Sequence, residues 1–533
     1  MRTSRWTQLL LLFLVGLVVA GCSPRGKRAD LVMINGAEPE SLDPAIITGQ
    51  PEGRVVRALF EGLTSMDAFG KAVPGVAESW EISEDGKVYT FKIRPDAKWS
   101  DGTPMTAHDF VKSWKRTLTP ETASAYNYQL YYIKNAQPFA EGKIDDFSQV
   151  GVKALDDRTL EVTLENPTSF FLDLCAFPTL FPVPVDVVEA KGDDWIKPGN
   201  LVGNGPFVLE DWRINDRIRL RKNPNYWDHE NVRLETVDLL PIAKANVAFN
   251  FFASGEADLS LDKGLAPTAL LDRLRGEPYF HASPFLGNYF LRFNCARGPF
   301  MDVRVRKAFS LAIDKERIVT KITRAGEIPA PTLVPPGLEG YVAPEGLSYN
   351  PEEARRLLAE AGFPNGKGFP LVRYLYSESE VNEAIAVELQ SMWREVLGVT
   401  VSLARQEWKV YLNSQKELDY DISRSSWVGD YPDPNTFLDL FVTGGGNNNT
   451  GWSDPEYDRL IADAAKETDP VKRMELLSRA EKILVEEQVP ICPIYYWVSI
   501  QLYDPAKIGG IEPNVLDEHS IRWMFLKDGE AGP

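Results

Sequence analysis

The feature that most constrains this chain is a short apolar segment near its N-terminus. Residues 9–20 form one apolar run of 12 residues, and Arg2 and Arg5 precede it. A membrane-spanning helix needs about 20 apolar residues, so this run is too short to cross a bilayer. A basic start followed by a short apolar run is typical of a secretory signal peptide. We therefore expect the rest of the chain to be exported and to fold outside the cytoplasm.

The apolar run ends in the residues Val19-Ala20-Gly21-Cys22. Small residues directly before a cysteine resemble the lipobox of bacterial lipoproteins. The resemblance implies a signal peptide over residues 1–21, cleavage before Cys22 and lipidation of the Cys22 thiol. Such a lipid holds a protein at a membrane surface without crossing it, and residues 22–29 would then form a tether. The alternative is an ordinary signal peptide with a chance cysteine.

Length and charge exclude several classes of protein. Single hydrophobic cores stop growing near about 250–300 residues, so a chain of 533 residues should form several domains. An apolar share of 44% is that of a globular protein and excludes a disordered or coiled-coil chain. The 58 basic and 76 acidic residues give a net charge of −18. Because binding to phosphate backbones needs a basic surface, we do not expect nucleic acid as a partner.

The motifs of catalysis and metal binding are missing from the sequence. None of its four histidines has the spacing of a metal ligand pair, and there is no C-x-x-C pair. The nucleophile elbow, the Walker A loop and the dinucleotide-binding glycine motif are also absent. We therefore expect no enzyme, no metal and no other cofactor. Cys175, Cys295 and Cys492 have apolar neighbours, which favours buried, inert thiols over a disulfide.

Strand and helix patterns alternate along the chain. Alternation with a period of two predicts strands, and a capping residue before an apolar face predicts a helix. Strands are expected at 31–34, 88–93 and 159–164, helices after Asp302, Asn350 and Asp469, and loops at 328–340 and 444–451. Together these patterns predict a mixed α/β protein with several lobes.

Nine short motifs along the chain carry a likeness to one known family. They are ESLDP (40–44), LFEGL (59–63), VPGVAESW (73–80), WSDGTP (99–104), NGPF (204–207), NPNYW (223–227), DVRVR (302–306), QEW (406–408) and WVGDY (427–431). Together they resemble the large solute-binding proteins that supply peptides to bacterial ABC importers, in their oligopeptide-binding branch. The likeness extends from about residue 30 to residue 526.

The resemblance implies an α/β clamshell, the two-lobed periplasmic-binding-protein fold in its large three-domain form. Lobe I would comprise residues 30–60, 185–286 and 499–527. An extra domain would comprise residues 61–184, and lobe II residues 287–498. Two strands that cross between the lobes near residues 286 and 498 would form the hinge.

The implied function is that of a receptor in the bacterial cell envelope, at its periplasmic or extracellular face. As a monomer, the chain would enclose short peptides between its lobes and deliver them to an ABC permease and its ATPase subunits. The same fold can hold another ligand, such as a metal chelate, an oligosaccharide or an opine, because function depends on the site. An envelope chaperone and a hydrolase are the remaining alternatives.

A receptor for many peptides must bind the features that all peptides share, the backbone and the terminal ammonium. A buried ammonium needs a carboxylate partner. The resemblance assigns this role to Asp430, with Trp427 and Gly429 beside it in the same motif. From the spacing alone, the favoured role of Asp430 is to cap the turn before Pro432.

The resemblance also implies walls for the peptide side chains. Trp408, Trp427 and Trp497 match aromatic pocket positions, and the extra domain would add Tyr126 or Tyr128; core packing is the alternative for each. Arg424 matches a base that meets the C-terminal carboxylate of a short peptide, with a surface ion pair as the alternative. The chain departs from the family pattern at Thr48, Thr323 and Asn382, and at Gly287 and Val428, where a relative has a disulfide. These departures leave the preferred peptide length and sequence open.

Overall fold

The computed structural model describes residues 28–527, without the side chains of Lys263, Thr268, Glu380, Trp408 and Lys409. The expected signal peptide and Cys22 lie outside the described residues. Two residues of the expected tether pack on the fold: Arg28 forms an ion pair with Asp258 at 2.9 Å, and Ala29 is buried. Among residues 28–527, every helix falls short of the length and apolarity that a bilayer crossing requires.

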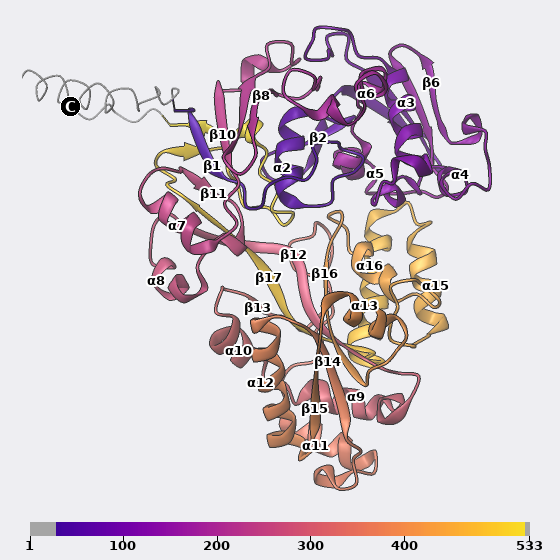
Figure 1. Ribbon diagram of the computed structural model, residues 1–533. Coiled ribbons are helices and arrows are strands. Elements are labelled where there is room, and N and C mark those ends of the chain that lie inside the picture. The colour runs from indigo at the N-terminus through magenta and orange to yellow at the C-terminus, as the bar shows by residue number, and fades with distance from the viewer. Residues whose placement is uncertain (1–27, 528–533) are drawn as a thin grey trace, which may run out of the picture.

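One large mixed sheet connects the upper and lower bodies of the molecule (Figure 1). Its strand order is β15-β14-β16-β12-β17-β11-β1-β10-β9-β8, and β13 also pairs with β17. The two long strands β12 (Phe280–Phe293) and β17 (Ile491–Tyr503) lie at its centre and pair in antiparallel fashion. Since these strands contribute to both bodies, the lobes are joined by a sheet and not by a flexible linker.

The upper body contains the residues expected for lobe I. Its core is formed by apolar side chains from three separate segments of the chain, including Leu31, Phe207 and Met524. Its strands are β1 (Leu31–Ile34), β8 (Phe207–Arg213), β9 (Arg217–Lys222), β10 (Thr236–Leu240), β11 (Leu259–Ser260), β18 (Ile508–Gly509) and β19 (Phe525–Leu526); its helices are α2 (Gln50–Leu59), α6 (Val185–Lys191), α7 (Ala245–Ala253) and α8 (Leu271–Leu274).

Most of the residues expected for the extra domain form a separate core beside lobe I, whereas Phe181 and Val183 pack in the core of lobe I. A four-stranded antiparallel sheet, in the order β4-β5-β7-β6, packs its apolar side chains against helix α3. The elements are β2 (Thr64–Met66), β3 (Ala72–Pro74), β4 (Ala77–Ile82), β5 (Val88–Ile93), β6 (Val152–Asp156), β7 (Thr159–Thr163), α3 (Ala107–Leu118), α4 (Ala136–Ala140) and α5 (Phe171–Leu174).

The lower body contains the residues expected for lobe II. Two core clusters lie in it, one around Trp393 and one around Phe437. The elements besides β12 and β17 are β13 (Ile328–Pro329), β14 (Val372–Ser377), β15 (Val401–Gln406), β16 (Ile422–Val428), α9 (Val303–Leu311), α10 (Lys315–Ile318), α11 (Pro351–Glu360), α12 (Glu380–Leu397), α13 (Trp408–Lys416), α14 (Asn435–Leu438), α15 (Pro455–Ala464) and α16 (Pro470–Lys482).

The pairing of β12 with β17 is interrupted where the two bodies meet. The register runs regularly as far as the pair Pro284↔Val498 and resumes, shifted, at Asn288↔Tyr496. An irregular ladder lets strands bend and twist locally. Residues 286 and 498, near which the hinge is expected, lie at this interruption.

Local sequence signals explain several of the elements. The side chains of Asp302, Asn350 and Asp469 each accept a hydrogen bond from the backbone of the first turn that follows, so the three predicted helices α9, α11 and α16 are confirmed. The predicted strands are confirmed as β1, β5 and β7. In β5 the alternating residues Tyr89 and Phe91 are buried.

One of the two loop predictions is wrong at its start. Ile328 and Pro329 form the short strand β13, whose partners are Tyr496 and Tyr495 of β17. Proline is compatible with an edge strand because no ladder hydrogen bond is needed from its nitrogen. Residues 444–451 contain neither helix nor strand, as predicted.

The three cysteines of the described part are free. Cys175 and Cys492 are buried, and Cys295 is half-buried. Burial raises the pKa of the Cys295 thiol to about 11 and the pKa of the Cys175 thiol well above its usual value. Thiols held in the protonated form are poor nucleophiles, in agreement with the expected inert role.

Candidate functional site

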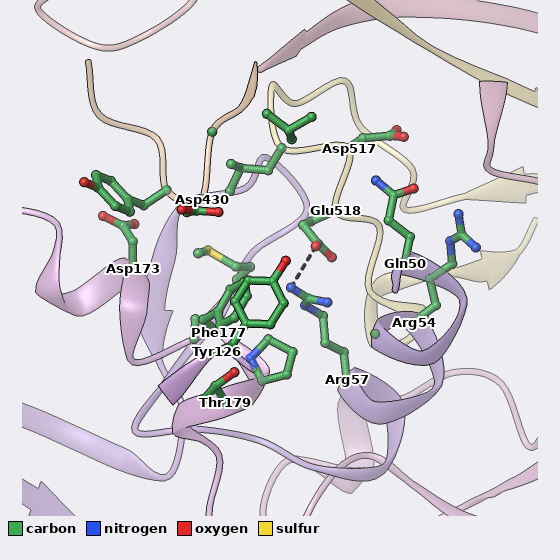
Figure 2. Close-up of a pocket in the computed structure, with 18 of the residues that line it drawn as sticks. Gln50, Arg54, Arg57, Tyr126, Asp173, Phe177, Thr179, Asp430, Asp517 and Glu518 are labelled. Atoms are coloured by element: carbon green, nitrogen blue, oxygen red, sulfur yellow. Dashed lines mark ion pairs between the residues drawn. The ribbon is translucent and has the colours of Figure 1, made fainter. Parts of the chain in front are cut away.

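A pocket lies where lobe I, the extra domain and lobe II meet (Figure 2). Its walls come from helix α2, from the segment 176–179 after α5, from the loop after β16, and from the C-terminal segment 516–518. The empty space amounts to about 1110 Å³, part of which opens to solvent. Clefts between domains are a common place for small ligands to bind.

Asp430 lines this pocket from the loop after β16. The loop is fixed on both sides of it: the Gly429 amide donates to the Leu286 carbonyl at 2.8 Å, and the Asp430 amide donates to Thr436 Oγ1 at 3.2 Å. Burial raises the pKa of Asp430 to about 6, although a contact with Gln129 acts in the opposite direction. Of the described residues, no lysine or arginine contributes to this pKa. Asp430 is thus a carboxylate without a cationic partner.

Gly429 is required by the close approach of this loop to β12. A Cβ atom at Gly429 would lie 2.5 Å from Cδ2 of Leu286 and 3.1 Å from the methyl group of Thr436. Both distances are shorter than van der Waals contact, so a side chain here would push the loop away from the strand. The glycine therefore sets the position of the Asp430 backbone.

Three further carboxylates lie near Asp430. Asp173, on α5, lines the pocket, and burial followed by the charge of Asp433 raises its pKa to about 6. Burial, with the charges of Asp430 and Asp433, raises the pKa of Asp439 to about 7. Only Asp433 has a cationic partner among the described residues, Arg473 at 2.6 Å, and both side chains are buried. Asp173 and Asp430 line the pocket, and Asp433 and Asp439 add negative charge behind them, so this wall is electrostatically suited to a cation.

The facing wall carries basic residues that are already paired. Arg57 of α2 forms an ion pair with Glu518 at 2.8 Å (Figure 2). Arg54, one turn earlier, contacts Asp262 at 3.4 Å. These guanidinium groups contribute little net positive charge to the pocket, so the acidic wall dominates.

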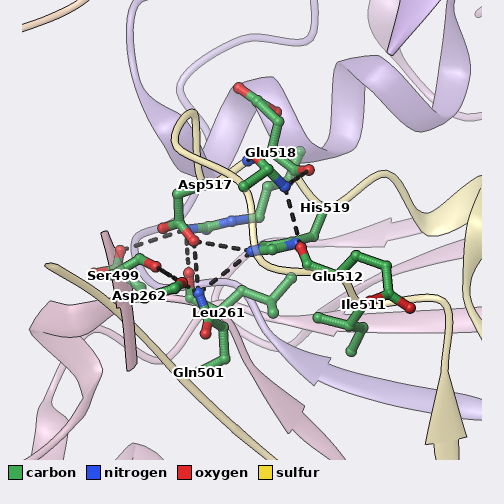
Figure 3. A network of polar contacts seen from close by, with 12 residues as sticks. Leu261, Asp262, Ser499, Gln501, Ile511, Glu512, Asp517, Glu518 and His519 are labelled. Carbon is green, nitrogen blue, oxygen red and sulfur yellow. Dashed lines mark hydrogen bonds and ion pairs between the residues drawn. The ribbon is translucent and has the colours of Figure 1, made fainter. Parts of the chain in front are cut away.

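Asp517, in the same wall, belongs to a buried polar network (Figure 3). Its Oδ1 accepts a hydrogen bond from Gln501 Nε2 at 2.8 Å and lies 3.0 Å from Nε2 of His519. Gln501 lies on β17 and also donates to Ser499 Oγ at 2.8 Å, and Ser499 contacts Ser283 of β12 at 2.9 Å. The network links the lining of the pocket to the crossing strands.

Aromatic rings form the floor of the pocket. Tyr126 and Phe177 both line it, with ring centroids 5.5 Å apart. Burial and the nearby Asp430 raise the pKa of the Tyr126 hydroxyl, which places the ring close to that carboxylate. Tyr128 packs against Tyr126 at 5.6 Å but is 41% exposed and does not line the pocket.

Three other predicted residues lie outside the pocket lining, and for a fourth, Trp408, the side chain is not described. Trp427 donates through Nε1 to Thr436 Oγ1 at 3.4 Å, the same oxygen that the Asp430 amide contacts. Trp497 of β17 stacks on Phe285, with centroids 6.2 Å apart, and Phe285 lines the pocket. The guanidinium of Arg424 lies 5.1 Å from the ring centroid of Tyr289 in lobe II. Trp408 begins α13, and its side chain is outside the described part.

The sequence reasoning missed several residues of the pocket. Asp173 stands in the apolar run Phe171-Leu172-Asp173-Leu174, and a lone carboxylate in such a run is a signal that could have found it. Arg57, Phe177 and Glu518 carry no comparable signal, because segments far apart in the sequence bring them together.

The positions that depart from the family pattern have individual explanations. Thr48 lines the pocket. Asn382 and Thr323 are buried and form hydrogen bonds inside lobe II, with Ser377 and Glu327 respectively. Gly287 and Val428 face each other as cross-strand partners of β12 and β16, so the place of a disulfide is occupied by a glycine–valine pair.

Comparison with known proteins identifies the family. The family model described as bacterial extracellular solute-binding proteins, family 5, matches residues 71–449. The periplasmic oligopeptide-binding protein OppA of Salmonella typhimurium is 41% identical over 507 residues, which cover 93% of this chain and 92% of the relative. This chain belongs to the bacterial extracellular solute-binding proteins of family 5.

Two further relatives show the fold and the range of ligands in this family. The unliganded open form of the periplasmic murein tripeptide-binding protein MppA superimposes with a TM-score of 0.83 at 38% identity, covering 94% of this chain and 98% of that one. The probable deoxycholate-binding periplasmic protein YgiS of Escherichia coli is 38% identical over 485 residues, 89% of each chain. The predicted two-lobed α/β fold is confirmed, and so is a binding protein rather than an enzyme.

Proposed function

We propose that this chain is the lipid-anchored receptor of a peptide ABC importer, which encloses short peptides between its lobes and delivers them to the permease. The observation that carries the proposal is Asp430, a carboxylate in the interlobe pocket without a cationic partner among the described residues. A desolvated carboxylate is stabilised as an anion when a cation joins it. The terminal ammonium of a peptide is such a cation, and relatives of this chain are named for peptide binding.

The neighbouring groups support a peptide in this orientation. Asp173 adds negative charge beside Asp430, and the rings of Tyr126 and Phe177 offer apolar area for the first side chains without demanding hydrogen bonds. We propose that Trp408, Trp427, Trp497 and Tyr128 add further aromatic surface when the lobes close, and that Arg424 meets the C-terminal carboxylate of a short peptide.

Replacement of Asp430 tests the proposal directly. Asp430→Asn keeps the shape of the side chain and removes its charge, so it should weaken the binding of Ala-Ala-Ala by about 30-fold to several thousand-fold, the cost of breaking a desolvated charge pair. Isothermal titration calorimetry on a protein without the lipid site measures this change. N-acetylation of the peptide should weaken binding to the unmodified protein to a similar extent and should have little further effect on the variant.

The matched control is Asp145→Asn, which removes the same charge from an exposed position of the extra domain. This control should bind Ala-Ala-Ala as the unmodified protein does. Equal affinity of the unmodified protein and the Asp430→Asn variant would refute the ammonium assignment.

A non-peptide ligand in the same fold is the second candidate, as a metal chelate, an oligosaccharide or an opine. The relative named for deoxycholate shows that similarity near 40% identity does not fix the ligand class. The acidic wall disfavours an anionic ligand of that kind, because Asp173 and Asp430 would repel it. Mass spectrometry of small molecules released by denaturing the purified protein separates the candidates: a ladder of short peptides supports the first, and a single non-peptide mass supports the second.

We also propose the membrane anchor and the domain boundaries. In the full-length protein, Cys22→Ser should move the protein from the detergent phase to the aqueous phase in a detergent partition experiment.

The three separate cores support a division into lobe I (30–60, 185–286, 499–527), the extra domain (61–184) and lobe II (287–498).

A further inference from the structure

Tyr431 is the residue after Asp430, and its side chain belongs to another part of the molecule. The loop that carries it continues from β16 of lobe II. Its ring, however, is 3% exposed and is buried within the core of the extra domain. There it stacks on Phe170, with ring centroids 3.8 Å apart and the ring planes 7° from parallel. A lobe II side chain thus completes a core that is otherwise built from residues 63–180.

Polar contacts hold the Tyr431 ring and its neighbours in place. The Tyr431 hydroxyl lies 3.4 Å from the Tyr132 hydroxyl and accepts a hydrogen bond from Asn435 Nδ2 at 3.2 Å. Two residues further, Asp433 accepts from Ser169 Oγ of the extra domain at 3.4 Å and pairs with Arg473 of α16. The same short loop is therefore bound to the extra domain at Phe170 and at Ser169.

The backbone between these anchors has little freedom. Gly429 is held against Leu286 at one end, and Pro432 and Pro434 restrict the backbone at the other. Asp430 lies between the anchor on β12 and the ring in the extra domain. A displacement of the Tyr431 ring must therefore move the adjacent Asp430.

We propose that Tyr431 is a positioning residue that sets the Asp430 carboxylate in the pocket. The extra domain then contributes to binding because its aromatic core holds the Tyr431 ring. The proposal rests on the proposed function, in which Asp430 binds the terminal ammonium of a peptide. It gives the extra domain a role in recognition beyond lining the pocket. It also predicts that an extra-domain residue outside the pocket lining, Phe170, affects the same interaction.

The test compares two peptides on three variants. Tyr431→Leu and Phe170→Leu remove the ring stacking from the two sides and keep apolar bulk, and Tyr431→Phe keeps the ring and removes only the hydroxyl. Calorimetry gives the dissociation constants of Ala-Ala-Ala and N-acetyl-Ala-Ala-Ala for each protein. The dissociation constant of the acetylated peptide divided by that of the free peptide reports the ammonium interaction alone, because a loss of general packing weakens the binding of both peptides equally.

The expected result is a loss of discrimination. In Tyr431→Leu and in Phe170→Leu the ratio should fall by about tenfold or more, a part of the loss expected when the charge pair itself is removed. Tyr431→Phe should keep the ratio within about threefold. A double variant should lose no more than either single leucine variant, because both act through one contact.

Three results would overturn the inference. The first is a ratio that stays constant while both peptides weaken, because this describes a purely structural role. The second is an unchanged ratio in Phe170→Leu. This variant is the milder change and still tests the inference if Tyr431→Leu fails to fold. The third is an unmodified protein without discrimination between the peptides, which would refute the proposed role of Asp430 as well and is recognised before any variant is made.

Discussion

The burial of Asp430 lowers the stability of the unliganded protein and favours the binding of a cation. Its carboxylate is partly desolvated, and no cationic group of the described chain compensates it. A peptide ammonium would supply the missing charge and stabilise the ionised form. The same reasoning applies to Asp173, whose pKa burial raises to about 6. The charge of the pocket therefore depends on pH through the ionisation of both carboxyl groups.

The affinity for a free peptide should depend on pH around the pKa of Asp430. In the unliganded protein burial raises this pKa to about 6, and an ammonium partner lowers it again. Below pH 6 the complex thus binds fewer protons than the free protein, and the affinity for Ala-Ala-Ala should fall by up to about tenfold per pH unit. Calorimetry between pH 5 and 7 measures this slope. Asp430→Asn should flatten it, and a steep slope in that variant would assign the effect to Asp173 or Asp439 instead.

The same carboxylate should lower the stability of the unliganded protein at neutral pH. Because its folded-state pKa is raised above the unfolded value near 3.8, the folded state binds more protons and stability is lost as pH rises from about 4 to 6. Asp430→Asn should therefore increase the free energy of unfolding at pH 7.5 by about 1–2 kcal/mol and change it little at pH 4. Denaturant unfolding at both pH values measures this. A variant that is less stable than the unmodified protein at pH 7.5 would contradict the argument.

At the scale of single elements, the strand pair β12–β16 explains one departure from the family. Gly287 and Val428 are cross-strand partners, and the hydrogen bond from the Gly429 amide to the Leu286 carbonyl flanks them. This places them in a non-hydrogen-bonded pair, where Cα atoms lie about 4.5 Å apart. A Cβ atom at Gly287 would lie 3.0 Å from Trp497. The glycine leaves that space to the tryptophan ring.

A disulfide should form when both positions are cysteine. The variant Gly287→Cys with Val428→Cys has Cα atoms within disulfide range, and Trp497 needs to shift by only a few tenths of an ångström. Peptide mapping by mass spectrometry under non-reducing conditions should detect the cross-link. The two single variants are the controls and should give none. Two free thiols in the double variant under oxidising conditions would show that the Trp497 ring cannot move aside.

Elements with strong local signals could be predicted from the sequence, and their arrangement could not. Helices α9, α11 and α16 follow an acidic or amide cap directly, and β5 has a clear two-residue alternation. The pocket instead combines Arg57, Asp173, Asp430 and Glu518 from four distant segments. Only Asp430 stood in a recognised motif. Local patterns contain no information on which segments meet, so the other three required the structure.

At the scale of the whole molecule, the pocket lies beside the strands that cross between the two bodies, and Phe285 of β12 is part of its lining. The lining comes from both lobes and the extra domain. Among the described strands, β12 and β17 are the two that run through both bodies within the large sheet. A ligand that contacts all walls gains most when they approach each other, so binding should favour rotation about the interrupted register near Pro284.

Binding of a peptide should therefore make the protein more compact. Small-angle X-ray scattering should show a smaller radius of gyration with saturating Ala-Ala-Ala than without it. Asp430→Asn at the same peptide concentration is the control and should keep the larger radius. Binding detected by calorimetry without a change in the radius would contradict closure of the lobes.

The threading of the chain through lobe I also determines when that lobe can form. Strand β1, among the first described residues, pairs with β10 and β11, and β11 pairs in turn with residues 502–503 of β17. Glu61 forms a buried ion pair with Arg522, close to the C-terminal end of the described chain. Lobe I thus cannot be completed until residue 522 has been delivered. For the exported chain proposed above this order would be useful, because strand β1 cannot complete its sheet, and the segment can pass through a narrow channel, until residues 502–522 follow.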